Sequence, residues 1–170
     1  DAAHARWRRL DALVNNASSY FAPAFGTIDD AQLDDLLASN LRAPLLLTQA
    51  CVKHFGDGAA VINLLDVQTR QPLPPYAAYH AAKAGLWSLT ESLALELAPR
   101  VRVNGVAPGH MIWALSGGID AERQAAELAR IPLGRLGGAE EIARAVRFLL
   151  SDDAAYITGA IVPVDGGLRL

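Results

Sequence analysis

The sequence has little cysteine, few aromatic residues and no large excess of charge of either sign. Its 170 residues include one cysteine, 6% aromatic residues, 15 Lys and Arg, and 18 Asp and Glu. The single Cys51 excludes a disulfide within the chain, and we expect a reducing, cytoplasmic location. The formal net charge of -3 provides no basic field, so neither nucleic acid nor an anionic membrane is an expected partner.

Long apolar runs and metal-binding spacings are absent as well. The apolar stretch Ala43–Val52 is interrupted by Pro44, Thr48 and Gln49 and is shorter than the roughly 18 residues that a membrane-spanning helix needs. The four histidines are scattered without the spacing of metal ligands, so we predict no metal site. The 52% hydrophobic content is instead typical of a globular protein with one core.

Apolar runs that fit buried strands alternate with segments of helical period. Because the strand segments are apolar on both faces, they predict a parallel sheet covered by helices on both sides, an α/β fold of the doubly wound type. The predicted strands are Leu10–Val14, Ala59–Leu65, Val101–Ala107 and Ile161–Val164. The predicted helices are Ala2–Arg9, Thr27 to about Phe55, a long helix from Pro74-Pro75 to near Ala98, Ala121–Ala129 and Ala139–Leu150.

The second predicted helix contains a proline. It opens with Thr27 and Asp30, which have the spacing of a capping box. Pro44 lies inside it and has no N–H to donate to the carbonyl of Asn40, four residues earlier. A carbonyl released in this way can hold an ordered water or an ammonium, so Asn40 could join a proton chain; a kinked helix with a solvated carbonyl is the alternative.

A tyrosine and a lysine lie on one face of the long helix. Tyr79 and Lys83 are four residues apart, and Asp66 lies thirteen residues before Tyr79, at the end of the second predicted strand. An ammonium beside the phenol would lower the tyrosine pKa from about 10 and make Tyr79 a proton donor or acceptor near neutral pH. Alone, such a pair also arises by chance on exposed helix faces.

Taken together, these motifs resemble the short-chain dehydrogenase/reductase family. The residues that carry the resemblance are Asn15-Asn16-Ala17, Asn40, Tyr79 with Lys83, Pro108-Gly109, Pro132-Leu133-Gly134-Arg135 with Glu140-Glu141-Ile142, and Thr158-Gly159 with Asp165-Gly166-Gly167. The resemblance implies a Rossmann-type fold, a nicotinamide cofactor and hydride transfer. It also implies a homo-tetramer formed through the helices that hold Asn40 and Tyr79.

The resemblance assigns roles to individual residues. Tyr79 would donate the proton, while Lys83 would bind the nicotinamide ribose and lower the tyrosine pKa. The implied catalytic residues are Asp66, Tyr79, Lys83 and Asn40. The implied cofactor-binding residues are Asn16, Ala17, Ser18, Tyr79, Lys83, Pro108 and Gly109.

Two departures from the family pattern resemble its pteridine reductase branch. Asp66 stands where most members carry a catalytic serine, and Ser18 stands where most carry glycine. Tyr20-Phe21 and Gln71-Pro72-Leu73 also match that branch. The implied reaction is NADPH-dependent reduction of a dihydrobiopterin- or dihydrofolate-type pterin. The implied substrate-binding residues are Ser18, Tyr20, Asp66 and Tyr79.

Several alternatives remain open at the sequence level. Tyr20 could be a loop aromatic packed on the core, and Asp66 could be a capping carboxylate. The substrate could be a carbonyl compound, such as a 3-oxoacyl thioester or a sugar. No glycine-rich phosphate loop joins a predicted strand to a helix, so we expect residues 1–170 to be the C-terminal two-thirds of one Rossmann domain whose first strand–helix units are absent. An inactive fragment is a further possibility.

Overall fold

A four-stranded parallel sheet forms the centre of the computed structural model, which describes residues 2–113 and 120–170. The strands follow one another across the sheet in sequence order. They are β1 (Leu10–Asn15), β2 (Phe55–Leu64), β3 (Val101–Pro108) and β4 (Ile161–Val164). This arrangement confirms the predicted parallel sheet of Rossmann type.

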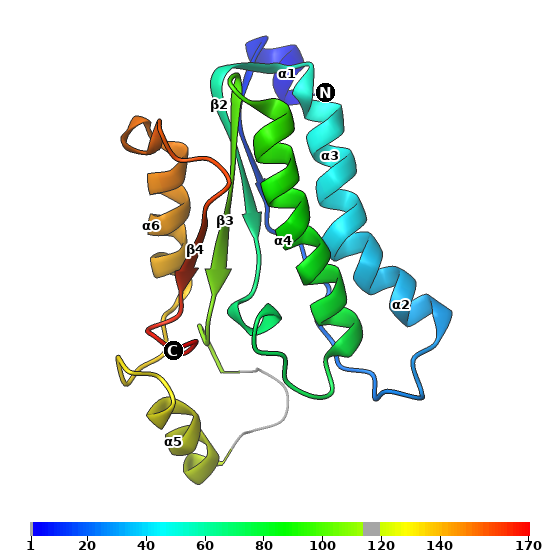
Figure 1. Ribbon diagram of the computed structural model, residues 1–170, viewed down its shortest axis with the longest axis vertical. Helices are drawn as coiled ribbons and strands as arrows, with labels where there is room; N and C mark the ends of the chain where they lie inside the picture. Colours follow the sequence, from blue (N-terminus) through cyan, green and yellow to red (C-terminus); the bar gives the residue numbers. More distant parts are fainter. Residues whose placement is uncertain (1, 114–119) are drawn as a thin grey trace.

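Helices cover both faces of the sheet, as Figure 1 shows. One face carries α2 (Asp30–Leu37), α3 (Ala43–Val52) and α4 (Ala77–Leu97). The other face carries α6 (Ala139–Leu150), while α1 (Ala2–Trp7) and α5 (Ala121–Ala129) lie toward opposite ends of the molecule. Leu149 of α6 packs on Ile62 and Val106, and Ala94 of α4 packs on Val61 and Val103, so each layer has its own core. Within the described part of the chain, no helix is long and apolar enough to cross a membrane.

The second strand begins earlier than predicted. Gly56 to Gly58 belongs to β2, whose first residue, Phe55, pairs with Leu10. The register then shifts, so that Ala12 pairs with Ala60. This irregularity accommodates the extra residues of β2, and the predicted start at Ala59 was therefore four residues too late.

The predicted capping box was placed two residues too early. α2 begins at Asp30, and its cap is Asp29, whose side chain accepts a hydrogen bond from Gln32 N. The Gln32 side chain accepts from Asp29 N in return, while the Thr27 hydroxyl donates to the carbonyl of Ala24 in the preceding turn. Asp29 and Gln32 have the same spacing as Thr27 and Asp30, so spacing alone did not distinguish the two pairs.

The helix continues through Pro44 by changing its hydrogen-bond pattern. Residues Ala38–Arg42 are π-helical, and Ala43 N donates to the carbonyl of Ala38, five residues earlier. The wider turn accommodates the proline ring and its missing N–H without ending the helix. α3 then ends at Val52, three residues before the predicted boundary.

Buried polar side chains link the sheet to the helices on one of its faces. Asn15 of β1 donates to Asn63 Oδ1 of β2 at 2.8 Å, and Asn63 Nδ2 donates to Thr90 Oγ1 of α4 at 2.9 Å. Asn63 and Thr90 are almost fully buried. This chain of buried bonds fixes α4 against β1 and β2.

Replacing Asn63 with alanine is expected to lower the free energy of unfolding by about 2–4 kcal/mol, because it removes the buried 2.8 Å acceptor of Asn15 Nδ2 and the buried donor to Thr90 Oγ1. Chemical denaturation measures this loss. Ser92→Ala is the matched control, since that exposed hydroxyl on α4 bonds the carbonyl of Ser88 in the same helix. Equal stability of the two variants would contradict the structural role of the network.

Candidate active site

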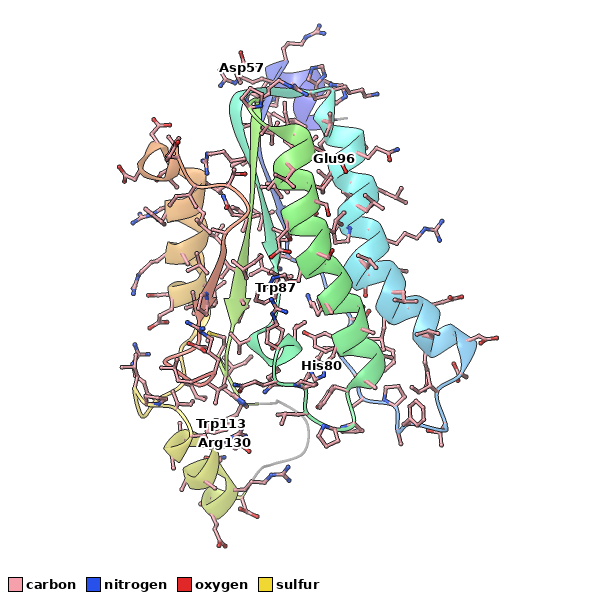
Figure 2. All side chains as sticks on the ribbon, viewed as in Figure 1. Asp57, His80, Trp87, Glu96, Trp113 and Arg130 are labelled. Atoms are coloured by element: carbon pink, nitrogen blue, oxygen red, sulfur yellow. The ribbon has the colours of Figure 1, made fainter. Side chains whose placement is uncertain are left out.

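A cavity of about 680 Å³ lies where β1, β2 and β3 end. It is also lined by residues of α4 and α6, and its size is typical of a small-molecule site. In Figure 2, His80 on α4 and Trp113 beyond β3 mark this end of the molecule. In parallel sheets with helices on both faces, ligands bind at this edge because the loops that follow the strands converge there.

Asp66 and Tyr79 are joined by a hydrogen bond inside this cavity. The Tyr79 hydroxyl donates to Asp66 Oδ2 at 3.0 Å, and Gln68 N donates to Asp66 Oδ1 at 2.8 Å. Asp66 thus caps the short 3-10 helix Val67–Thr69 and also contacts Tyr79. The structure therefore shows Asp66 both as a capping carboxylate and as a carboxylate that lines the cavity.

The surroundings of Tyr79 raise its pKa. The side chain is buried, which disfavours the phenolate, and the negative charge of Asp66 together with its hydrogen bond favours the protonated form. The net shift in the pKa of Tyr79 is therefore opposite to the lowering expected from the sequence. Lys83 Nζ lies 5.8 Å from the Tyr79 ring centroid, whereas Asp66 accepts a hydrogen bond from the Tyr79 hydroxyl directly.

Lys83 is buried and has a single hydrogen-bond partner among the described residues. Its Nζ donates to the carbonyl of Leu64, the last residue of β2, at 2.8 Å. Burial lowers the pKa of Lys83 from 10.5 to about 8, although the negative charge of Asp66 opposes this shift. An ammonium has three donors, so Lys83 retains donors for a molecule in the cavity that it lines.

The pKa of Lys83 makes folding stability depend on pH. Between pH 8 and 10.5 the unfolded chain binds more protons at this lysine than the folded chain, so its contribution to stability increases as the pH rises. We expect Lys83→Met to be more stable than the parent at pH 7, and this advantage to shrink by about 3 kcal/mol at pH 10.5. Urea denaturation at both pH values measures it. The exposed Lys53→Met is the control, and parallel pH profiles for both variants would contradict the low pKa.

Asn40 holds the loop that follows β1. Its Oδ1 accepts from the Ser18 hydroxyl at 2.6 Å, and its Nδ2 donates to the carbonyls of Ser19 and Leu36. The side chain is fully buried and does not line the cavity. Its hydrogen bonds within the described residues reach neither Lys83 nor Tyr79, so the predicted proton chain through Asn40 remains a prediction.

Tyr20 belongs to an aromatic cluster beside Tyr79. Its ring stacks on Tyr76 with centroids 5.0 Å apart and meets the edge of the Tyr79 ring at 4.9 Å. His80 packs against Tyr76 and Tyr79 from within α4, and burial lowers its pKa. Tyr20 is still 57% exposed and lines the cavity, so an aromatic face remains available next to the Tyr79 hydroxyl.

Most of the site residues expected from the sequence meet at this cavity. Ala17 and Asn40 are the exceptions, because neither contributes to its wall. Sequence reasoning also missed two polar residues of the wall, Gln68 and His110. The available signal was their position, with Gln68 two residues after Asp66 and His110 directly after Pro108-Gly109. The expected residues that line the cavity are Asn16, Ser18, Tyr20, Asp66, Tyr79, Lys83, Pro108 and Gly109.

Comparison with known proteins agrees with this fold. Residues 1–169 match a family model described as enoyl-(acyl carrier protein) reductase. The chain is 38% identical over 169 residues to the 3-oxoacyl-acyl-carrier-protein reductase FabG of Escherichia coli (strain K12), covering 98% of this chain and 69% of the relative. It is 37% identical over 194 residues to pteridine reductase 1 of Leishmania tarentolae, covering 100% of this chain and 66% of the relative.

A solved structure has a closely similar fold. The crystal structure of a short-chain dehydrogenase/reductase, titled glucose/ribitol dehydrogenase, from Brucella melitensis superimposes with a TM-score of 0.91 at 30% sequence identity. The match covers 99% of this chain and 68% of that one, so the chain spans about two-thirds of the length of these relatives.

The sheet and the residues at its carboxyl edge define an oxidoreductase built on a Rossmann-like fold. The chain belongs to the short-chain dehydrogenase/reductase family. Members of this family use NAD(P)H.

The residues of the cavity fit the nicotinamide end of such a cofactor. Gly109 N donates to the carbonyl of Val164, and a Cβ on Gly109 would lie 2.8 Å from Asp165 Cα. Glycine therefore lets β3 and β4 come together at the cavity rim. The remaining donors of Lys83 and the hydroxyl of Tyr79 suit the ribose hydroxyls of the cofactor.

Proposed function

We propose that this chain carries the catalytic and substrate-binding part of an NADPH-dependent reductase whose substrate is a pterin of the dihydrobiopterin or dihydrofolate type. The observation that carries the proposal is the hydrogen bond from the Tyr79 hydroxyl to Asp66 Oδ2, 3.0 Å long. It places a proton donor and an acceptor-only carboxylate side by side at the carboxyl edge of the sheet.

The carboxylate at position 66 bears on the choice of substrate. A serine hydroxyl in that place could donate to a ketone oxygen and polarise it, whereas a carboxylate can only accept a hydrogen bond. Both oxygens of Asp66 already accept from the protein, one from Gln68 N and one from Tyr79. A substrate that brings its own N–H donors suits this site better than a simple ketone, and a pterin ring has such donors.

The proposed chemistry assigns a separate task to each side chain. When bound, the nicotinamide supplies the hydride. Tyr79 donates the proton to the adjacent ring nitrogen of the substrate. Lys83 binds the ribose hydroxyls, and Asp66 orients the Tyr79 hydroxyl. Asn40 supports the proton path indirectly, because its side chain holds the loop at Ser18 in place.

Ser18 and Tyr20 are the proposed substrate contacts from the loop after β1. A pterin is flat and polarisable, so it stacks well on a tyrosine face. Tyr20 is backed by the parallel ring of Tyr76, which fixes the orientation of this face. The Ser18 hydroxyl, held by Asn40 Oδ1, lines the same cavity and offers a polar contact at the ring edge.

A carbonyl substrate is the second candidate. The chain is as similar to a 3-oxoacyl reductase, at 38% identity, as to a pteridine reductase, at 37%.

Three further parts of the proposal are supported by family resemblance alone. They are the preference for NADPH over NADH, a homo-tetramer and a cytoplasmic location. We also propose that residues 1–170 form the C-terminal two-thirds of one Rossmann domain.

A side-by-side assay tests the proposal. NADPH oxidation by the full-length protein is measured with dihydrobiopterin, dihydrofolate, an acetoacetyl thioester and a sugar. We expect the two pterins to be reduced with the highest kcat/KM, and NADPH to be preferred to NADH. Preferential reduction of the thioester or the sugar would establish the carbonyl alternative. NADPH titration of the 170-residue chain itself tests the remaining alternative: absence of binding would support an inactive fragment, and tight binding would refute it.

A further inference from the structure

Two polar side chains on the wall of the cavity contact each other. Gln68 lies in the 3-10 helix that follows Asp66, and His110 follows β3 directly after Gly109. Their Nε2 atoms are 3.3 Å apart, and both residues line the cavity together with Asp66 and Tyr79. The proposed proton transfer uses neither residue, so their contact needs a separate explanation.

This contact leaves at least one donor and one acceptor for a ligand. If the Gln68 amide nitrogen donates to His110 Nε2, the imidazole proton lies on Nδ1, and His110 Nδ1–H and Gln68 Oε1 remain without a partner among the described residues. If the amide is turned over, His110 Nε2 donates to Gln68 Oε1, and Gln68 Nε2 and His110 Nδ1 remain. Both arrangements present at least one donor and one acceptor.

The backbone holds the two side chains in position. Gln68 N donates to Asp66 Oδ1, the carboxylate that also accepts from Tyr79. The carbonyl of His110 accepts from Gly137 N at 3.1 Å. Both side chains are half-buried. The pair is thus preorganised at a fixed place relative to the Tyr79 hydroxyl, which reduces the entropic cost of binding a ligand there.

We infer that Gln68 and His110 form a specificity-determining pair that binds a donor–acceptor edge of the substrate, such as the –CO–NH– edge of a cyclic amide. This inference rests on the proposed function, since the pyrimidinone ring of a pterin has such an edge. An aliphatic acyl chain would leave both polar groups without a partner. Sites built to hydrogen-bond a substrate discriminate strongly against analogues that lack the matching groups.

The test replaces each residue by an apolar side chain of similar size. For Gln68→Met, for His110→Leu and for the double variant, we expect KM for dihydrobiopterin to rise by about 10-fold or more, with kcat changed by less than about threefold. The double variant should be little worse than either single variant, because each residue positions the other. We expect kcat/KM for an acetoacetyl thioester to be unchanged or higher. Gln71→Met is the matched control, since Gln71 lies outside this cavity and bonds the carbonyl of Arg169.

A cyclic keto-amide separates this inference from the proposed function. Isatin carries a –CO–NH– edge beside a reducible ketone. If the protein does not reduce dihydrobiopterin but prefers isatin to the thioester, and this preference is lost in the Gln68 and His110 variants, the pair recognises the edge and the proposed pterin function is wrong. If the parent reduces dihydrobiopterin and the variants affect all substrates equally or not at all, the inference is overturned while the pterin function stands.

Discussion

Replacing Tyr79 with phenylalanine is expected to lower kcat for the reduction by about 10²–10⁴-fold, while the dissociation constants for pterin and NADPH change little. The substitution removes one oxygen and leaves the ring, so the packing against Tyr20 and His80 is retained. A proton donor acts mainly in the transition state, and its loss therefore reduces kcat more than binding. Stopped-flow measurement of NADPH oxidation and equilibrium titrations separate the two effects.

Tyr156→Phe is the matched control for this experiment. Its side chain is fully exposed on the surface, so the same change of hydroxyl to hydrogen is expected to leave turnover unaffected. If Tyr79→Phe kept nearly full turnover, Tyr79 would not be the proton donor and the catalytic assignment would be wrong.

Replacing Asp66 with serine is expected to change the substrate preference. Both oxygens of Asp66 accept hydrogen bonds, and serine is also a good helix cap, so the 3-10 helix that Asp66 caps should keep its conformation. We expect kcat/KM for dihydrobiopterin to fall by about 10-fold or more and kcat/KM for a simple ketone to rise, because the hydroxyl can donate to a carbonyl oxygen. Unchanged pterin turnover would show that Asp66 is not part of the catalytic site.

Asp66 variants also test the electrostatic argument independently of activity. The charge of Asp66 and its hydrogen bond both raise the pKa of Tyr79, and burial raises it further. In Asp66→Asn we therefore expect the pKa of Tyr79 to fall but to stay above its ordinary value of 10.0, since the burial remains. Ultraviolet titration of tyrosinate, with the corresponding Tyr79→Phe protein subtracted, measures this pKa. An unchanged Tyr79 titration would contradict the interaction between the two groups.

Much of the fold could be predicted from local patterns. The strands Leu10–Asn15 and Ile161–Val164 lie where apolar runs placed them, within one residue. Boundaries were wrong where two local solutions compete, as at Thr27 and Asp29, which offer alternative caps with the same spacing. The start of β2 was missed because the glycines at 56 and 58 are typical of a turn, while pairing with β1 draws them into the sheet.

The amino-acid sequence by itself determined which residues share a helix face and which follow the strands. The four-residue separation of Tyr79 and Lys83 places them on the same side of α4, and the apolar strands bring Asp66 and His110 to one edge of a parallel sheet.

Only the tertiary structure decided how these groups interact. It paired Tyr79 with Asp66, gave Lys83 the carbonyl of Leu64, and placed Gln68 against His110. It also reversed the expected shift in the pKa of Tyr79. The physical reason is that burial and distances between elements depend on packing, whereas spacing along the chain specifies only neighbours on the same element.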